Sequence, residues 1–163
     1  SLAQIQSLHA EGRVSSVRLH GTWSAGLPFR PWAYDELLGW LSAQRIPAWI
    51  PLPELDPDQL VATLQRHPDL VTVLVGAHYA HHLLVRPLLS VLPNAHLELS
   101  RYEPIGEVET LCRAFGAWRL VYGSWCPRYA MGPILFYLHQ TDLSDKELAL
   151  VCGGNVQRLL GAG

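Results

Sequence analysis

Histidine side chains gather in one short stretch of the chain, residues 78–82, which reads His-Tyr-Ala-His-His. Imidazole nitrogens are common metal ligands, and His78 and His82 stand four residues apart, the spacing that places two side chains on one face of a helix. A His-x-x-x-His metal site is therefore one interpretation. The other is that these histidines simply begin a helix, because no carboxylate that could complete a metal site stands nearby in the sequence.

Two further polar residues, His20 and Glu54, each follow a short apolar run. Enzymes built on parallel strands place their functional side chains just after the strand ends. His20 and Glu54 are therefore candidate metal ligands. The alternative for both is an ordinary solvated loop residue.

The segment 21–32 is long, aromatic and rich in Pro and Gly, and it contains Trp23, Phe29 and Trp32. Aromatic side chains often form the walls of pockets for planar or apolar ligands. Trp23 and Trp32 are therefore candidate substrate-binding residues. Equally, the aromatic side chains of this segment could plug the top of the molecule as part of its core.

Apolar runs rich in Val, Leu and Ile predict the elements that position these side chains. The runs are continuous more than alternating, as is typical of parallel strands buried on both faces. They span residues 14–20, 48–52, 70–77, 96–100 and 120–123. Between them, apolar residues at helical spacing predict helices over residues 34–44, 56–65, 83–92 and 107–115, and a final pair of helices begins near residue 143. Strands that alternate with helices indicate an α/β fold with a parallel sheet.

Capping residues mark where two of these helices begin. Asp56 is a good N-cap, and Pro57 follows it at the first helical position. Ser144 and Glu147 have the spacing of a capping box, in which each side chain bonds to the other residue's backbone N–H.

Composition argues against two classes of partner. The chain has 163 residues, of which 49% are hydrophobic and 16% charged, and a net charge of −2, which suits one globular core. Its basic residues are scattered, so no basic face for a nucleic acid is predicted. No apolar run is long enough to predict a membrane span. The three cysteines lack metal-binding or disulfide spacing, which favours free thiols in a reducing, cytoplasmic environment.

Several segments resemble one known family, the amidohydrolase-2 branch of the metal-dependent hydrolases. Residues 119–127, Arg-Leu-Val-Tyr-Gly-Ser-Trp-Cys-Pro, are similar to the family's last strand, in which apolar residues lead to Gly-Ser-Asp. Residues 93–100, Pro-Asn-Ala-His-Leu-Glu-Leu-Ser, resemble the preceding strand, and residues 154–161 resemble the closing Gly-Asn-x-x-Arg-Leu helix. Further similarities cover residues 17–20, 45–50 and 69–78, so the resemblance extends over the whole chain.

This resemblance implies a (β/α)8 TIM barrel, of which residues 1–163 would supply the last five β/α units as a single, partial barrel domain. A closed barrel needs eight strands and about 250 residues, and an open sheet exposes apolar edges. We therefore expect that an N-terminal segment or another chain completes the barrel, or that a homo-oligomer seals it.

The resemblance also assigns chemistry to three strand ends. The family holds a divalent metal, such as zinc or manganese, with histidines after several strands and an aspartate after the last, and the metal activates a water molecule. His78 stands at one histidine position and is the expected metal ligand and catalytic residue. Pro51 stands at another and Trp125 at the aspartate position, and neither side chain can ligate a metal. The metal is therefore either absent or held with help from His20, Glu54 or residues outside this chain.

Two functions remain open. One is a metal-dependent hydrolase of a small carboxylated, cyclic-ester or aromatic substrate. The other is a non-catalytic barrel that binds a small molecule or a protein, with Trp125 and Trp23 over its pocket. Two structural expectations accompany both functions. Arg18, inside a predicted buried strand, should have a carboxylate or carbonyl partner, for which Glu98 is an obvious candidate, and Asn155 should cap the closing helix.

Overall fold

A parallel sheet runs through the centre of the protein, which is seen here as a computed structural model that describes residues 1–20 and 28–161. Each new strand adds beside the previous one, in the order β1-β2-β3-β4-β5. The strands are β1 (Val17–Arg18), β2 (Ala48–Pro51), β3 (Thr72–Val75), β4 (Ala95–Glu98) and β5 (Leu120–Val121). The predicted α/β fold with a parallel sheet is therefore confirmed.

Helices follow each strand, as the sequence predicts. The α-helices are α1 (Leu2–Ala10), α2 (Pro31–Ala43), α3 (Pro57–Leu64), α4 (His82–Val91), α5 (Glu107–Phe115), α6 (Gly132–His139), α7 (Asp145–Ala149) and α8 (Asn155–Leu159). Short 3-10 helices are η1 (Leu52–Glu54), η2 (Tyr79–His81) and η3 (Ala117–Arg119), and η4 (Leu150–Gly154) is a π-helical turn. None of the helices in the described ranges is long and apolar enough to cross a membrane.

The predicted caps form as expected. Asp56 Oδ1 accepts a hydrogen bond of 2.9 Å from Gln59 N and so begins α3. At α7, Ser144 Oγ accepts from Glu147 N, while Ser144 N donates to Glu147 Oε2 at 2.9 Å. Both caps satisfy backbone N–H groups that have no partner within the first helical turn.

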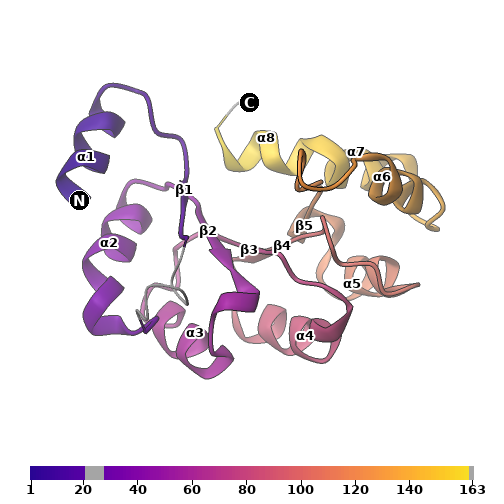
Figure 1. Cartoon of the computed structure of the whole chain (residues 1–163), viewed down its shortest axis with the longest axis horizontal. Helices are drawn as coiled ribbons and strands as arrows, with labels where there is room; N and C mark the ends of the chain where they lie inside the picture. The colour runs from indigo at the N-terminus through magenta and orange to yellow at the C-terminus, as the bar shows by residue number, and fades with distance from the viewer. Residues whose placement is uncertain (21–27, 162–163) are drawn as a thin grey trace.

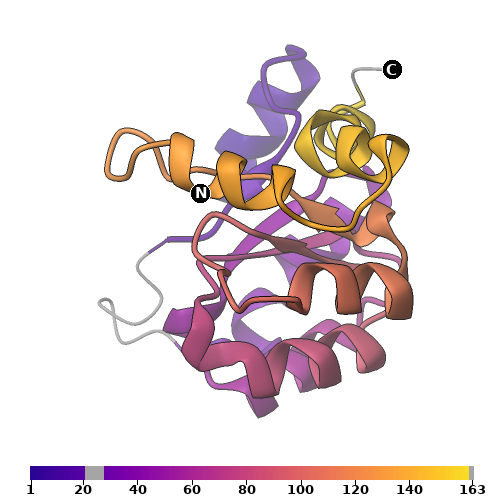
Figure 2. The same ribbon diagram turned by 90° about the vertical axis from the view of Figure 1, so that its right-hand side faces the viewer.

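Side chains alternate between the two faces of the sheet, and each face packs against its own set of helices. Residues such as Ile50, Leu74 and Leu97 join the large core between the sheet and α2–α5. Figure 1 shows α3 and α4 below the strands and α2 beside them. The opposite face carries a smaller cluster in which Val73 and Val121 pack with α8. Figure 2 shows the same arrangement from the side, with α6–α8 above the sheet and α4 and α5 below it. We call the face toward α8 the inner face.

The outer edge of β5 is covered by the last helices. Tyr122 N donates to Val151 O of η4 at 2.9 Å. Asn155 Nδ2 donates to Leu120 O and Ala117 O, both at 2.8 Å, and Asn155 is fully buried. The prediction that Asn155 caps the closing helix is therefore wrong, because its side chain instead satisfies one carbonyl group of η3 and one of β5.

Buried Arg119 anchors the start of β5 through backbone carbonyls, and it forms no ion pair with a carboxylate in the described ranges. Its guanidinium donates to Leu92 O at 2.8 Å, to Leu89 O at 3.1 Å and, through Nε, to Ala95 O. Leu89 O belongs to the last turn of α4, whose carbonyls lack partners within the helix. Arg119 therefore ties β5 to the end of α4 and the beginning of β4.

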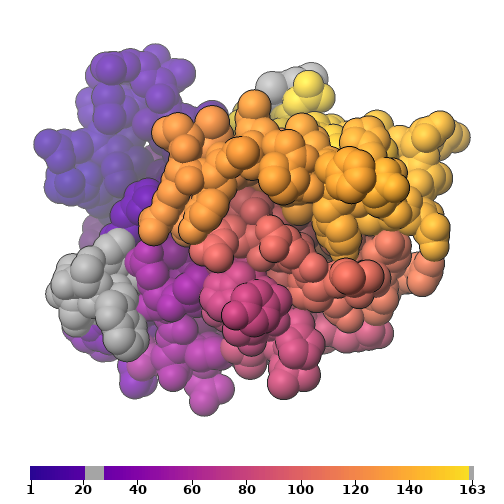
Figure 3. Space-filling model, turned by 45° about the vertical axis from the view of Figure 1, so that its right-hand side comes forward, coloured from indigo at the N-terminus to yellow at the C-terminus, as the bar shows by residue number. Residues whose placement is uncertain are grey.

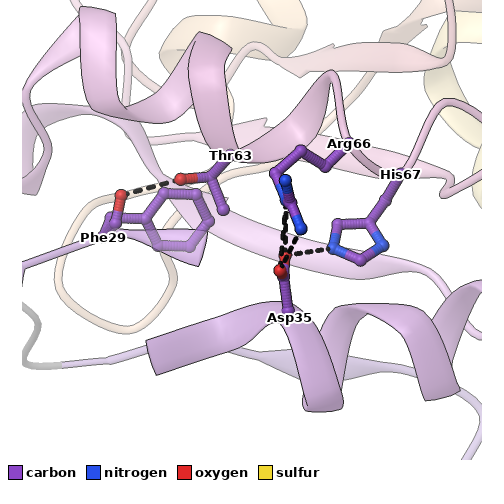
Figure 4. Close-up of polar contacts among 5 residues, drawn as sticks. All are labelled: Phe29, Asp35, Thr63, Arg66 and His67. Carbon is purple, nitrogen blue, oxygen red and sulfur yellow. Dashed lines mark hydrogen bonds and ion pairs between the residues drawn. The ribbon is translucent and has the colours of Figure 1, made fainter. Parts of the chain in front are cut away.

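Hydrogen bonds join α2 and the residue Phe29 before it to α3 and the segment that follows α3 (Figure 4). Asp35 of α2 receives hydrogen bonds from Arg66 Nη2 at 2.7 Å and from His67 Nε2 at 2.9 Å. The Thr63 hydroxyl donates to Phe29 O at 2.9 Å, and Phe29 is only 1% exposed. Of the aromatic side chains predicted for this segment, Phe29 therefore lies in the core beneath α2.

Candidate functional site

All five parallel strands end at the same edge of the sheet, and a pocket of about 430 Å³ opens there. We call it the strand-end pocket. Its walls come from β1, β2, β3 and the segment after β5, namely Arg18, His20, Pro51, Pro53, Glu54, Val75, Gly76 and residues 125–128. Figure 3 shows the orange segment between β5 and α6 beside the salmon segment that follows β4.

The structure brings three of the predicted site residues together in this pocket. His20 follows β1, Glu54 ends η1 after β2, and Trp125 follows β5, and all three line the strand-end pocket. Trp32 lies elsewhere, on the first turn of α2, where 78% of its surface is exposed. Trp23 falls outside the described residues.

His78 lies at the end of β3 but does not line the strand-end pocket. Its Nδ1 accepts a hydrogen bond from Ala80 N at 3.3 Å, and its own N–H donates to His81 Nδ1 at 3.2 Å. The two imidazole rings meet edge to face with their centroids 4.1 Å apart. Both Nδ1 atoms thus serve to cap η2.

Of the two interpretations of this stretch, the His-x-x-x-His pair does not form, whereas a helix does begin at these histidines. His78 has extended backbone angles, φ −134° and ψ 179°, whereas His82 is the first residue of α4. The 3-10 turn η2 lies between them, so the two side chains do not share a helical face. His82 Nδ1 instead donates to Tyr79 O at 2.9 Å.

Trp125 has a left-handed backbone conformation, with φ +55°, which residues other than glycine rarely adopt. A Cβ on Gly76 would stand 3.1 Å from Trp125 Cζ2, so the indole lies against the end of β3 at a residue without a side chain. The indole Nε1 is buried and has no hydrogen-bond partner in the described part of the chain. A buried donor without a partner is costly, so this N–H is available to a water molecule or a ligand.

Arginine and aromatic side chains stack beside Trp125. The Tyr129 ring centroid lies 6.0 Å from that of Trp125. The Arg128 guanidinium carbon lies 5.8 Å from the Trp125 ring and 5.9 Å from the Tyr129 ring. The Arg101 guanidinium carbon lies 4.9 Å from the Tyr129 ring. Of these side chains, Trp125 and Arg128 line the strand-end pocket, so the stack holds the Arg128 guanidinium in the pocket wall.

Glu98 lies on the inner face at the end of β4, and the residue is only 5% exposed. Its Oε1 accepts from Ser100 N at 2.9 Å, and its Oε2 accepts from Ser100 Oγ at 2.9 Å and from Gly76 N at 3.3 Å. A Cβ on Gly123 would stand 1.6 Å from Oε1, so Glu98 occupies the space that a side chain on β5 would need. Burial raises the pKa of the Glu98 carboxyl.

The predicted Arg18–Glu98 ion pair is not present. Arg18 is exposed, and no ion pair between these side chains lies within 4.0 Å among the described residues. Arg18 faces the inner side of β1, which has no further strand beside it among the described residues, so burial does not force Arg18 to find a close partner. The two groups still interact at longer range, because the charge of Arg18 lowers the pKa of Glu98 in opposition to burial.

The family's metal can be compared with the donors that are present. Pro51 and Trp125 line the pocket but offer no lone pair to a metal. In the ranges that the structure describes, no group of three or more His, Cys, Asp or Glu side chains is placed to hold a metal ion. The described residues therefore do not fit a metal centre of the family's kind.

Sequence reasoning missed two features of this site. Arg128 follows Trp125 by three residues, and Arg128 N donates a hydrogen bond of 2.9 Å to Trp125 O in a turn that brings both side chains to one pocket. Glu98 was expected to be a structural partner for Arg18, and only the structure shows it buried against Gly76 and Gly123. The apolar residues around Glu98 in the sequence are the one signal that could have indicated its burial.

Comparison with known proteins places this geometry in a family. The family model described as Amidohydrolase matches residues 1–162. No curated protein matches the chain. Among solved structures, an uncharacterised TIM-barrel protein from Bordetella bronchiseptica has a TM-score of 0.76 at 20% sequence identity, over 98% of this chain and 61% of that one.

Two further solved structures agree on the fold. The 4-oxalomesaconate hydratase of Rhodopseudomonas palustris has a TM-score of 0.69 at 15% identity, over 98% of this chain and 59% of that one. Amidohydrolase 2 of Bifidobacterium longum subsp. infantis has a TM-score of 0.61 at 16% identity, over 90% of this chain and 61% of that one. The chain thus spans about three fifths of the length of these structures. Its fold is part of a TIM barrel, and the chain belongs to the amidohydrolase family.

Proposed function

We propose that the strand-end pocket binds a small organic molecule that carries a carboxylate, with an arginine-lined rim in place of the family's metal. The observation that carries this proposal is the pocket of about 430 Å³ with Arg18 and Arg128 in its wall and Trp125 at the family's aspartate position. Pockets for small ligands commonly measure about 300–1,000 Å³, so its size suits such a molecule.

The charge of the pocket favours an anionic ligand. Arg18 and Arg128 form no ion pair with a carboxylate in the described part of the chain. A guanidinium presents two parallel N–H donors that match a carboxylate, and such charged hydrogen bonds are stronger than neutral ones. Glu54 also lines the pocket, so the ligand's anionic end is expected to lie toward the two arginines and away from Glu54.

The remaining walls suit a compact organic body. Pro51, Pro53 and Val75 give the pocket an apolar side, and the Trp125 indole adds a flat surface with a buried N–H donor. A planar ligand could stack on the indole while its carboxylate meets Arg128. The relative described as 4-oxalomesaconate hydratase acts on a carboxylate by its name, which supports the same class of ligand here.

Metal-dependent hydrolysis remains a second candidate, since His20 and Glu54 line the same pocket as Arg18. Together they supply a nitrogen and a carboxylate, which is fewer ligands than a catalytic zinc site needs. This candidate therefore requires ligands from β/α units other than the five described. Such units would pair with β1, which has β2 on one side and no other strand among the described residues. A second copy or a further segment that closes the barrel is part of this proposal.

Calorimetric titration of the purified chain with isophthalate tests the proposed ligand class. Isophthalate is a flat dianion and suits the indole and the arginines together. Arg128→Ala and Arg18→Ala should each weaken binding by about tenfold or more, because each removes a charged hydrogen bond. Arg86→Ala, an exposed arginine on α4 away from the pocket, is the matched control and should bind like the wild type. Equal affinity in all four proteins would refute the proposal.

A further inference from the structure

A second pocket, of about 180 Å³, lies next to the strand-end pocket and shares none of its lining residues. We call it the β4–α6 pocket. One wall is the segment that follows β4, with Ser100, Arg101 and Glu103, and the other is the segment that leads into α6, with Tyr129, Ala130, Pro133 and Ile134. Figure 3 shows these two segments side by side. The ring of Tyr129 lies 6.0 Å from that of Trp125 in the strand-end pocket, so the two pockets are neighbours.

Both walls of the β4–α6 pocket are anchored to the core. Tyr102 stands between the two charged residues of the first wall, is fully buried, and donates from its N–H to Leu99 O at 3.0 Å. Ile134, only 3% exposed, fixes the beginning of α6. The Tyr137 hydroxyl of α6 donates to Pro104 O at 2.9 Å and so joins the two walls directly. The pocket therefore has a fixed width.

The β4–α6 pocket presents one cation and one anion that do not neutralise each other. Arg101 and Glu103 both line it, and neither forms an ion pair with another side chain in the ranges that the structure describes. Arg101 is half-buried, and its guanidinium carbon lies 4.9 Å from the ring centroid of Tyr129. A β-bridge to His78 also fixes its backbone. The cation is thus held in place before a ligand arrives, which lowers the entropic cost of binding.

The rest of the lining is apolar or neutral. Ala130, Pro133, Ile134 and the Tyr129 ring form one side, and no third charged residue contributes to the pocket. Pockets for drug-sized ligands measure about 300–1,000 Å³, so this smaller space suits a molecule of few atoms. Such a ligand has to bring an anionic group, a cationic group and a short apolar chain together.

We propose that the β4–α6 pocket binds a small aliphatic α-amino acid as a zwitterion. The carboxylate meets the Arg101 guanidinium, whose parallel N–H donors match it, and the ammonium group meets Glu103. The aliphatic side chain lies against Pro133 and Tyr129. Glu103 is exposed, so water screens its attraction and it contributes less than Arg101. This site goes beyond the proposed function and does not rest on it.

Nuclear magnetic resonance titration of the nitrogen-15-labelled chain tests this with three probes of one carbon skeleton. L-Leucine carries both charges, 4-methylpentanoate is leucine without the ammonium group, and 3-methylbutylamine is leucine without the carboxylate. Leucine should shift the amide signals of residues 100–103 and 129–132 and leave those of His20 and Glu54 in the strand-end pocket unchanged. Loss of the carboxylate should weaken binding by about tenfold, and loss of the ammonium group by about threefold.

Variants assign each charge of the ligand to one side chain. Arg101→Gln should weaken the binding of leucine and 4-methylpentanoate by about tenfold and leave that of 3-methylbutylamine unchanged. Glu103→Gln should weaken the binding of leucine and 3-methylbutylamine by about threefold and leave that of 4-methylpentanoate unchanged. Arg86→Gln is the matched control, because this exposed residue of α4 lines neither pocket, and it should bind all three probes like the wild type.

Three results would overturn the inference. Leucine that shifts no signal of the β4–α6 pocket, or shifts only signals of the strand-end pocket, contradicts the site. Equal affinity for leucine and 4-methylpentanoate, with no effect of Glu103→Gln, contradicts recognition of a zwitterion. Unchanged affinity for leucine in Arg101→Gln contradicts the role of that arginine. A failure of isophthalate to bind overturns the proposed function alone, because the two pockets share no lining residue.

Discussion

Replacing Gly123 by alanine tests the packing at the centre of the site. The new Cβ would stand 1.6 Å from Glu98 Oε1, 2.5 Å from its Cδ and 2.9 Å from its Cγ, so the Glu98 side chain has to move. The φ of Gly123 lies outside the left-handed region, so alanine brings no backbone strain of its own. Movement of Glu98 breaks its three hydrogen bonds to Gly76 and Ser100. We expect a loss of roughly 2–4 kcal/mol in the free energy of unfolding.

A double-mutant cycle measured by chemical denaturation checks this reasoning. Glu98→Ala alone should also destabilise the protein, because it leaves Gly76 N–H and the Ser100 hydroxyl without their acceptor. In that background Gly123→Ala should cost less than about 1 kcal/mol, since the clash is gone, and the coupling energy should be roughly 1–3 kcal/mol. Gly132→Ala is the matched control, because nothing lies within 4 Å of its new Cβ. Additive costs at positions 98 and 123 would refute the account.

Three further predictions concern the framework. Burial lowers the pKa of His96 to about 4, so the unfolded chain binds a proton at higher pH than the folded protein does. The free energy of unfolding should therefore fall by roughly 3 kcal/mol as the pH drops from about 6.5 to about 4. Denaturant titrations of His96→Phe should show a flatter pH dependence. Asn155→Leu should cost about 2–4 kcal/mol, because it removes both donors at the edge of β5, and a melting temperature equal to wild type would contradict this. Arg66 and His67 lower the pKa of Asp35. The wild type should therefore have a higher free energy of unfolding than Asp35→Asn at neutral pH, and this difference should disappear as the pH falls through the lowered pKa. A difference that persists in strong acid would contradict this reasoning.

The sequence predicts the fold well where local chemistry decides it. Buried parallel strands are continuous apolar runs, and Asp56 and Ser144 begin α3 and α7 through bonds to their own neighbours in the chain. The observed strands are shorter than the apolar runs. The run 70–77, for example, contains β3 (Thr72–Val75), which ends before Gly76, whose φ is +76°.

The candidate site was predicted less completely, because its decisive contacts join distant segments. Helical spacing suggested that His78 and His82 share a face, but an intervening 3-10 turn breaks that spacing. Arg18 looks like a buried strand residue in the sequence, yet it lies on an edge strand and is exposed. The close approach of Glu98 to Gly123 depends on the register of β4 and β5, which no local pattern encodes.

The family resemblance supplied the positions of Pro51 and Trp125, and both line the strand-end pocket. It also pointed to His78 as metal ligand and catalytic residue, whereas the structure places that side chain in the cap of η2. Its catalytic role stays a prediction. The residues of the strand-end pocket are thus better indicated by the structure than by the family motif alone.

The most direct test of the central claim is the affinity of chelator-treated protein for isophthalate, measured with and without added zinc. The account predicts the same affinity in both samples, because Arg18 and Arg128 hold the carboxylates and the described residues supply no metal centre. Binding that appears only after zinc is added would contradict the account and would favour a metal-dependent hydrolase completed by ligands beyond the described residues.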